Sequence, residues 1–301
     1  MRISTSMIYD QGVSALQQQS ASLLYTQQQI ASGRKIVTPA DDPVASARAL
    51  DVTQSRSVNT QFTRNQGYAQ DALKLVEGQL TGAGDILQYA RDRVLEAGNP
   101  TLSASDRRAI ATDLRAQFDS MLAIANTRDA NGDYLFAGYQ SRDPAFSGNA
   151  DGGVSYQGDQ GSRTMQVSSS RFMPTTFAGE QVFGSDSAGV FATLSTFISA
   201  LEDGPVSGVS GAVTTALDGI DRNFDRVLSA QAQIGSQQVE IDQLSSIGSD
   251  LDLQYATTLS NLQDLDYNEA FSRLSQQQTI LQAAQQSFLK ITGLSLFNYL
   301  N

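Results

Sequence analysis

Two pairs of neighbouring carboxylates are the residues best suited by type to do chemistry: Asp41 with Asp42, and Asp264 with Asp266. Paired carboxylates can divide general acid and base roles between them when both reach one substrate atom. On a helix, adjacent residues point about 100° apart and residues two apart about 200°, so neither pair converges there. The sequence therefore favours helix capping by Asp42 over a catalytic role.

The remaining catalytic repertoire is narrow, because the 301 residues include no His, Cys or Trp. This composition excludes imidazole bases, thiol nucleophiles, disulfides and the His-Glu-x-x-His zinc site. A Ser-Lys enzyme stays formally possible, with Lys35, Lys74 and Lys290 as the only lysines. The Gly-rich segments 151–153 and 158–161 lack the repeated spacing of a calcium site and are interpreted as ordinary turns. We expect no enzyme, no cofactor and no metal.

Charge and hydropathy exclude two further classes of function. The net charge is −11 and no basic stripe is present, which argues against nucleic acid as a ligand. No run of about 18 apolar residues occurs, and the first 30 residues lack the features of a cleaved secretory signal. We expect neither nucleic-acid binding nor membrane insertion.

The N-terminal segment predicts a helix with a thin apolar stripe. Residues at alternating steps of four and three form this heptad seam: Tyr9, Val13, Leu16, Ser20, Leu23, Gln27 and Ile30. Asp10 is the only charged residue between Ile3 and Gly33. Such a stripe buries too little surface to hold a lone helix, so the segment needs a partner.

The C-terminal segment has the same character and is the predicted partner. Its seam is Tyr267, Ala270, Leu274, Gln277, Leu281, Ala284, Phe288 and Ile291. Residues 270–301 carry only Arg273 and Lys290 as charges. A preceding seam ending at Leu265 is offset by one residue, which predicts a coiled-coil stutter near Asp266. About 30 residues at each end make rods of roughly 45 Å, which predicts one antiparallel coiled coil.

The middle of the chain predicts a helical bundle. Gly33 is expected to end the N-terminal helix, and Asp42-Pro43 is expected to begin the next one. Residues 33–42 between them are interpreted as a hinge. A helix should run from about Pro43 to Ala97, and Ser103 with Asp106 forms a candidate capping box for an antiparallel return helix. After the insert, a short helix from about Ser187 to Gly204 and then a long helical stretch complete the bundle.

Residues 131–187 predict a small β-rich insert, because glycines and short β-prone runs replace the heptads. The candidate strands are Tyr134 to Phe136, Val154 to Tyr156, Thr164 to Val167 and one near Phe172, with 149–153 as a turn. Pro174 limits the last to an edge. The fold class is mainly α, with both termini forming an antiparallel coiled coil and this β domain inserted in the middle. The expected domains are 1–42 paired with 260–301, 43–130 with 188–259, and 131–187.

Short sequence motifs mark both ends of the chain. The N-terminal motifs are Arg2-Ile3-Ser4-Thr5, residues 30–36 and Asp41-Asp42-Pro43. The C-terminal motifs are residues 264–270, 281–284 and 294–300. Together they resemble the ends of the flagellin and hook-associated family of the bacterial flagellum. The resemblance covers residues 1–146 and 260–301, and it implies a flagellin-like fold.

Within this family, Asn131 to Gly138 followed by Pro144-Ala145-Phe146 resembles the entry into the β domain of junction subunits; Ala145 departs from the usual Pro-Phe pair. The resemblance implies a secreted, extracellular structural subunit that forms the ring between hook and filament. It implies export through the flagellar type III channel. The implied partners are further copies of the chain, an adjacent hook-associated junction protein, flagellin and an export chaperone. Flagellin itself is the alternative, and a type III needle-tip protein ranks last.

The residues expected to form the assembly seam are Leu16, Leu23, Ile30, Leu281, Phe288 and Ile291. The alternative is that some of them merely pack inside a stable monomer. Ordering each residue costs about 1 to 2 kcal/mol of backbone entropy, and a thin seam returns little of it. We therefore expect residues 1–33 and about 260–301 to stay unfolded in the monomer and to fold against neighbours. Arg34 and Lys35 could bind an acidic partner, although solvated cations beside a loop are the plainer interpretation.

Overall fold

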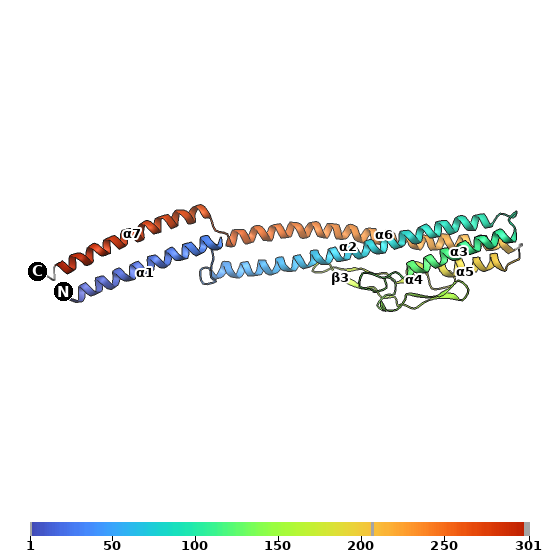
Figure 1. Ribbon diagram of the computed structural model, residues 1–301, viewed down its shortest axis with the longest axis horizontal. Helices are drawn as coiled ribbons and strands as arrows, with labels where there is room; N and C mark the ends of the chain where they lie inside the picture. Colours follow the sequence, from blue (N-terminus) through green and yellow to red (C-terminus); the bar gives the residue numbers. More distant parts are fainter. Residues whose placement is uncertain (1, 206–207, 298–301) are drawn as a thin grey trace. The chain divides into compact units, whose positions relative to one another are not determined.

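A computed structural model describes residues 2–205 and 208–297, with side chains for residues 7, 9–205 and 208–290. The chain is mainly helical (Figure 1). Its elements in chain order are α1 (Arg2–Ser32), α2 (Pro43–Ala97), α3 (Ala104–Ala125), β1 (Phe146–Asn149), β2 (Gly153–Tyr156), β3 (Thr164–Gln166), β4 (Phe172–Pro174), α4 (Gly179–Phe183), α5 (Val190–Glu202), α6 (Val209–Gln263) and α7 (Tyr267–Phe297). None of the helices in the described ranges has an apolar stretch that would cross a membrane.

The chain divides into two compact units, which we call the terminal unit and the middle unit. The terminal unit is Met1–Val58 with Asp250–Asn301, and the middle unit is Asn59–Ser249. In the terminal unit α1 and α7 lie side by side and run in opposite directions, as the sequence predicts (Figure 1). The start of α2 and the end of α6 also pair there, through a 2.8 Å ion pair between Arg56 and Asp252.

The predicted stutter near Asp266 is wrong, because the helix breaks there. Helix α6 ends at Gln263 and α7 begins at Tyr267. The main-chain N–H of Leu265 leaves the helical pattern and donates to Gly33 O at 3.1 Å. Asp266 then caps α7 by accepting from the N–H groups of Asn268 and Glu269, at 2.9 and 3.3 Å. A one-residue change of seam therefore marks two helices, not one continuous coil.

The middle unit is built on the antiparallel pair α2 and α6. Helix α2 carries a seam at heptad spacing, and all its members are buried: Leu73, Val76, Leu80, Ala83, Leu87, Ala90 and Val94. The predicted capping box of α3 is confirmed, with Ser103 Oγ accepting from Asp106 N–H. Helix α3 returns antiparallel to α2, since Asp113 meets Tyr89 and Thr127 meets Gln79. Helix α5 packs on α3, which completes the helical layer.

The insert holds two antiparallel hairpins, β1 with β2 and β3 with β4. The strands around Val154, Thr164 and Phe172 are confirmed, and Pro174 closes its short sheet opposite Thr164. The predicted strand from Tyr134 to Phe136 is wrong: Tyr134 makes one isolated bridge to Arg128. Phe136 O instead accepts from the N–H of Gly179. Gly179 begins the short helix α4, which the sequence did not predict. This apolar run is buried in a turn, where a continuous ladder cannot form.

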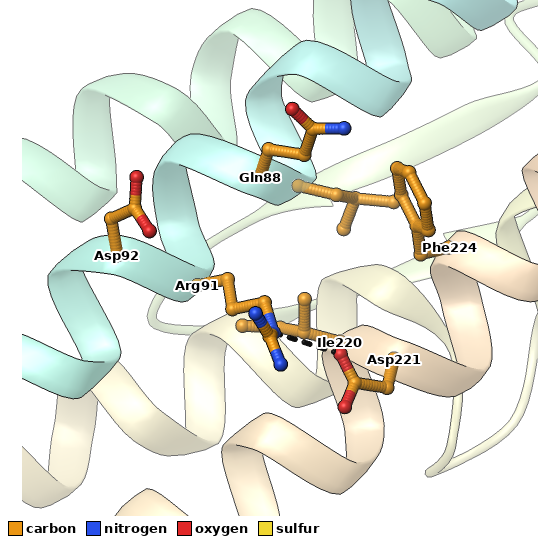
Figure 2. A pocket seen from close by; sticks show the side chains of 7 residues that line it. Gln88, Arg91, Asp92, Ile220, Asp221 and Phe224 are labelled. Atoms are coloured by element: carbon orange, nitrogen blue, oxygen red, sulfur yellow. Dashed lines mark hydrogen bonds and ion pairs between the residues drawn. The ribbon is translucent and has the colours of Figure 1, made fainter.

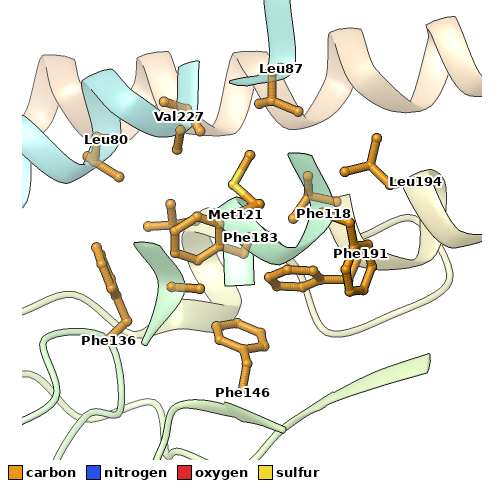
Figure 3. Packing of buried hydrophobic residues seen from close by; sticks show 14 of the residues in the cluster. Leu80, Leu87, Phe118, Met121, Phe136, Phe146, Phe183, Phe191, Leu194 and Val227 are labelled. Atoms are coloured by element: carbon orange, nitrogen blue, oxygen red, sulfur yellow. The ribbon is translucent and has the colours of Figure 1, made fainter. Parts of the chain in front are cut away.

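Phenylalanines join the insert to the helices. Phe118 (α3), Phe146 (β1), Phe183 (α4) and Phe191 (α5) converge on one cluster (Figure 3). Phe146 lies centrally, with ring centroids 5.1 to 5.7 Å from Tyr156, Phe183 and Phe191. Edge-to-face and tilted pairs at such distances stabilise beyond area burial. The insert and the helices of the middle unit therefore share one hydrophobic core.

The hydroxyl of Tyr156 gives the middle unit a pH dependence. It donates to Asp159 O at 2.7 Å, and burial is the main cause that raises the pKa of Tyr156 to about 12. The unfolded phenol titrates near 10. The stabilisation is therefore complete below about pH 10 and is lost as pH rises towards 12. We expect the difference in unfolding midpoint in urea between wild type and Tyr156→Phe to shrink over that window. An unchanged difference from pH 9 to 12 would contradict this.

Candidate assembly surface

The predicted seam residues lie along the facing sides of α1 and α7. Five of them are half-buried within this single chain: Leu16, Leu23, Ile30, Leu281 and Phe288. The side chain of Ile291 lies outside the described residues. One chain therefore uses the seam to pair its own two ends. Whether the same residues govern assembly stays a prediction.

A glycine that sequence reasoning missed permits the close approach of α1 to α7. A Cβ placed at Gly12 would lie 2.7 Å from two ring carbons of Phe288. The ring of Phe288 also meets that of Tyr9, with centroids 5.3 Å apart. Gly12 occupies the seam side of α1 four residues before Leu16, and this spacing is the signal that could have found it.

Main-chain hydrogen bonds join the two breaks between helices into one joint. Lys35 N–H donates to Gln263 O at 2.7 Å, and Leu265 N–H donates to Gly33 O at 3.1 Å. Arg34 and Asp264 form an antiparallel bridge between these bonds. The predicted hinge at 33–42 is thus tied to residues 263–265. We refer to this arrangement as the joint.

The carboxylates of Asp41 and Asp42, at the joint, accept hydrogen bonds from main-chain N–H groups. Asp42 Oδ1 accepts from Ala45 N–H at 2.9 Å, so its predicted capping of α2 is confirmed. Asp41 Oδ2 accepts from the N–H groups of Thr38 and Val37, at 2.7 and 3.0 Å. The Thr38 bond is the main cause that lowers the pKa of Asp41. Burial, and then the neighbouring Asp41, raise the pKa of Tyr25.

A buried amide adds to the joint. The side chain of Gln29 is 4% exposed, and its Nε2 donates to Lys35 O at 2.6 Å. Its neighbour Thr26 is also buried and donates to Ser22 O at 3.1 Å. The joint is therefore held by main-chain hydrogen bonds, by the carboxylates of Asp41 and Asp42 and by the amide of Gln29. Arg34 and Lys35 themselves are exposed, and the proposed acidic partner for them stays a prediction.

The middle unit has a groove between α2 and α6, of about 380 Å³ (Figure 2). Leu87, Ile220 and Phe224 form its apolar wall. Arg91 and Asp221 bind each other across it at 3.0 Å. This pair neutralises itself, and Asp92 is the other charged residue in the lining. Among the described residues, no group of three acidic side chains is arranged to hold a metal.

Comparison with known proteins shows what the chain is similar to. Residues 3–141 match the bacterial flagellin N-terminal helical region. The flagellar hook-associated protein 3 of Salmonella typhimurium is 35% identical, and that of Escherichia coli 33%, each over 99% of both chains. Flagellins also match, at 24 to 30% identity over 37 to 72% of this chain. A structure of a putative flagellar hook-associated protein from Vibrio parahaemolyticus has the same fold, with a TM-score of 0.70, 23% identity, and coverage of 74% of this chain and 100% of that one.

Proposed function

This chain belongs to the flagellar hook-associated protein 3 family, and we propose that it is the structural subunit that joins the flagellar hook to the filament. One observation carries the proposal: the similarity to hook-associated protein 3 extends over 99% of both chains. The alternative, flagellin, is less well supported, since flagellins match at lower identity and over less of the chain.

The terminal unit supplies the means of assembly in this proposal. Helices α1 and α7 carry few charges and pair through half-buried seam residues. A single thin seam returns little of the entropy lost on ordering two helices. The chain therefore polymerises into a ring with other copies, and neighbouring subunits supply the missing burial.

Coupled folding predicts that the ends are open in the dilute monomer. Limited proteolysis of purified chain is expected to remove residues up to about 33 and from about 260, and to leave the middle unit, because the ends lack neighbours. Mass spectrometry of the products identifies the cut sites. Protease resistance of both ends in the monomer would contradict coupled folding.

The remaining roles follow from the family. The chain leaves the cell through the flagellar type III channel with an uncleaved N-terminal signal, while an export chaperone holds its C-terminal helix. In the flagellum a second hook-associated protein lies on its hook side and flagellin on its filament side. Its role is structural, and it needs no cofactor.

Deletion of the chain in its host tests the proposed function. Electron microscopy is expected to show bare hooks, and an immunoassay is expected to find soluble flagellin in the medium, because filaments have nowhere to attach. Complementation with the intact chain is the control. Intact filaments on the deletion strain would overturn the junction role and favour a minor flagellin.

Gly33 is expected to matter for assembly, because its φ is +68° and a Cβ there would lie 2.9 Å from the Tyr267 hydroxyl. An L-residue in this conformation costs about 1 to 2 kcal/mol, so Gly33→Ala should lower incorporation about 5- to 30-fold. The measurement is the ratio of variant to wild-type chain in flagella of cells that express both.

Two variants separate the causes of this loss. Gly78→Ala is the matched control, since a Cβ at that helical glycine meets nothing within 4 Å. In a Tyr267→Phe background the steric part of the Gly33→Ala effect should disappear and the backbone part should remain. Equal incorporation of Gly33→Ala and wild type would show that the joint has another geometry in the flagellum.

A further inference from the structure

Three large apolar side chains remain exposed beside the joint: Leu24 on α1, and Tyr267 and Phe271 on α7. They are 58%, 48% and 54% exposed. Tyr267 and Phe271 are four residues apart, and their ring centroids lie 6.1 Å from each other. We call these three residues the joint patch.

Helical geometry places the joint patch on one flank of the α1–α7 pair. Leu24 directly follows the seam residue Leu23, and Phe271 directly follows the buried Ala270, so each lies about 100° round its helix from the seam. In an antiparallel pair of right-handed helices, the residue that directly follows a seam residue faces the same side of the pair on both helices. Leu24 and Phe271 therefore lie on the same side. The contacts of Arg34 with Asp264 and of Tyr9 with Phe288 fix the register. Leu24 therefore lies within about one helical turn of Phe271.

The opposite flank of the pair has a different chemistry. Glu269 and Arg273 form an ion pair there at 2.9 Å. The positive charge of Arg273 also interacts with the hydroxyl of Tyr25, which lies beside Asp41. The nearest residues on the patch flank are uncharged and exposed: Gln28, Ala31, Ser275 and Gln278. One flank thus carries the charges, and the other carries the apolar surface.

The occupant that fits the joint patch is the terminal unit of a second copy of this chain. A charged partner surface would lose its hydration against Leu24 and Phe271 without finding a counter-charge. Helices α1 and α7 offer a matching surface, because charged residues are sparse in them and Gln, Ser and Ala are frequent. The helices of the middle unit carry charges at short intervals, as at Asp85, Arg91 and Asp92, and fit less well.

We propose that the joint patch is covered by the terminal helices of a neighbouring copy, so that Leu24, Tyr267 and Phe271 hold copies together while the seam holds each copy's own ends together. This division of roles rests on the proposed function. It differs from the seam hypothesis in naming Leu24 and Phe271, which lie on the flank one position beyond the seam. Tyr267 begins the predicted C-terminal seam, but it is 48% exposed and its ring lies beside that of Phe271. Patch residues are expected to affect assembly and to leave the folding of a single chain intact.

The test introduces one charge at a time into the full chain. Leu24→Asp and Phe271→Asp alter the patch, and Phe271→Leu is the conservative variant. Gln18→Asp and Gln286→Asp are the matched controls, because both residues are exposed and point away from the seam and the patch. Each variant replaces the wild-type gene in the deletion strain. The measurements are the amount secreted, its circular dichroism, and the amount bound to isolated hooks.

Leu24→Asp and Phe271→Asp are expected to be secreted and folded like wild type. The amount of each variant bound to isolated hooks is expected to be lower than that of wild type by about tenfold or more. Phe271→Leu, Gln18→Asp and Gln286→Asp should remain near wild-type levels. Wild-type incorporation of both patch variants, or equal loss in the two glutamine controls, would overturn the proposal. Complete rings of patch variants that fail to hold a filament would also overturn it, because the patch would then face flagellin. Bare hooks in the deletion strain keep the proposed function intact in all three cases.

Discussion

Phe288→Asp is expected to abolish incorporation of the chain into flagella, while the secreted protein keeps its folded middle unit. The ring of Phe288 lies against Gly12 and Tyr9, on the facing side of α7. An aspartate there places a carboxylate in the seam, where the neighbouring seam side chains Leu16 and Leu281 offer no counter-charge. A buried unpaired charge costs several kcal/mol, which corresponds to roughly 100-fold or more in incorporation.

The measurement is the ratio of variant to wild-type chain in sheared flagella from cells that express both. Gln286→Asp adds the same charge two residues away on the exposed face and should incorporate normally. Leu281→Asp should behave like Phe288→Asp, because Leu281 lies two turns earlier on the same stripe. Normal assembly of both seam variants would reject the seam and leave the joint patch as the candidate contact.

Heptad spacing and end signals predicted the helices because each rests on local chemistry. Asp42-Pro43 starts α2 by capping and by a preset φ, and Ser103 with Asp106 starts α3 by reciprocal bonds. The seam of α2 from Leu73 to Val94 is buried as its spacing indicates. Pairing of the ends followed from their shared lack of charge. Capping residues and heptad spacing act within a few residues of their own position in the chain, so they can be identified from the local sequence.

Features that depend on distant partners could not be predicted in the same way. The break between α6 and α7 depends on two main-chain hydrogen bonds, from Lys35 N–H to Gln263 O and from Leu265 N–H to Gly33 O. These partners are more than 200 positions apart in the chain. A change of seam at Asp266 fits a stutter and a break equally well. Gly12 owes its role to the ring of Phe288 on another helix. Tyr134 to Phe136 has the composition of a strand, but its partners are turns and the start of α4.

The joint patch illustrates why the spacing of apolar residues alone does not assign their roles. Leu23 and Leu24 are neighbours of identical type, yet Leu23 faces α7 and Leu24 is 58% exposed. A heptad pattern identifies the first and treats the second as noise. Only the antiparallel geometry shows that Leu24 and Phe271 share a side. An exposed apolar group beside a seam is therefore informative once the pairing of the helices is known.

Phe146→Ala is expected to destabilise the middle unit by about 3 to 5 kcal/mol, because it leaves a cavity among Tyr156, Phe183 and Phe191. Phe146 is 2% exposed, and its main chain exchanges hydrogen bonds with the side chain of Asn126 at 2.8 and 2.9 Å, so the strand cannot easily move to fill the space. Thermal unfolding followed by circular dichroism should show a midpoint lower by about 6 to 20 °C. Phe172→Ala is the matched control in the same insert, since Phe172 is 56% exposed and should shift the midpoint little. Equal shifts for the two variants would mean that the aromatic cluster does not anchor the insert to the helices.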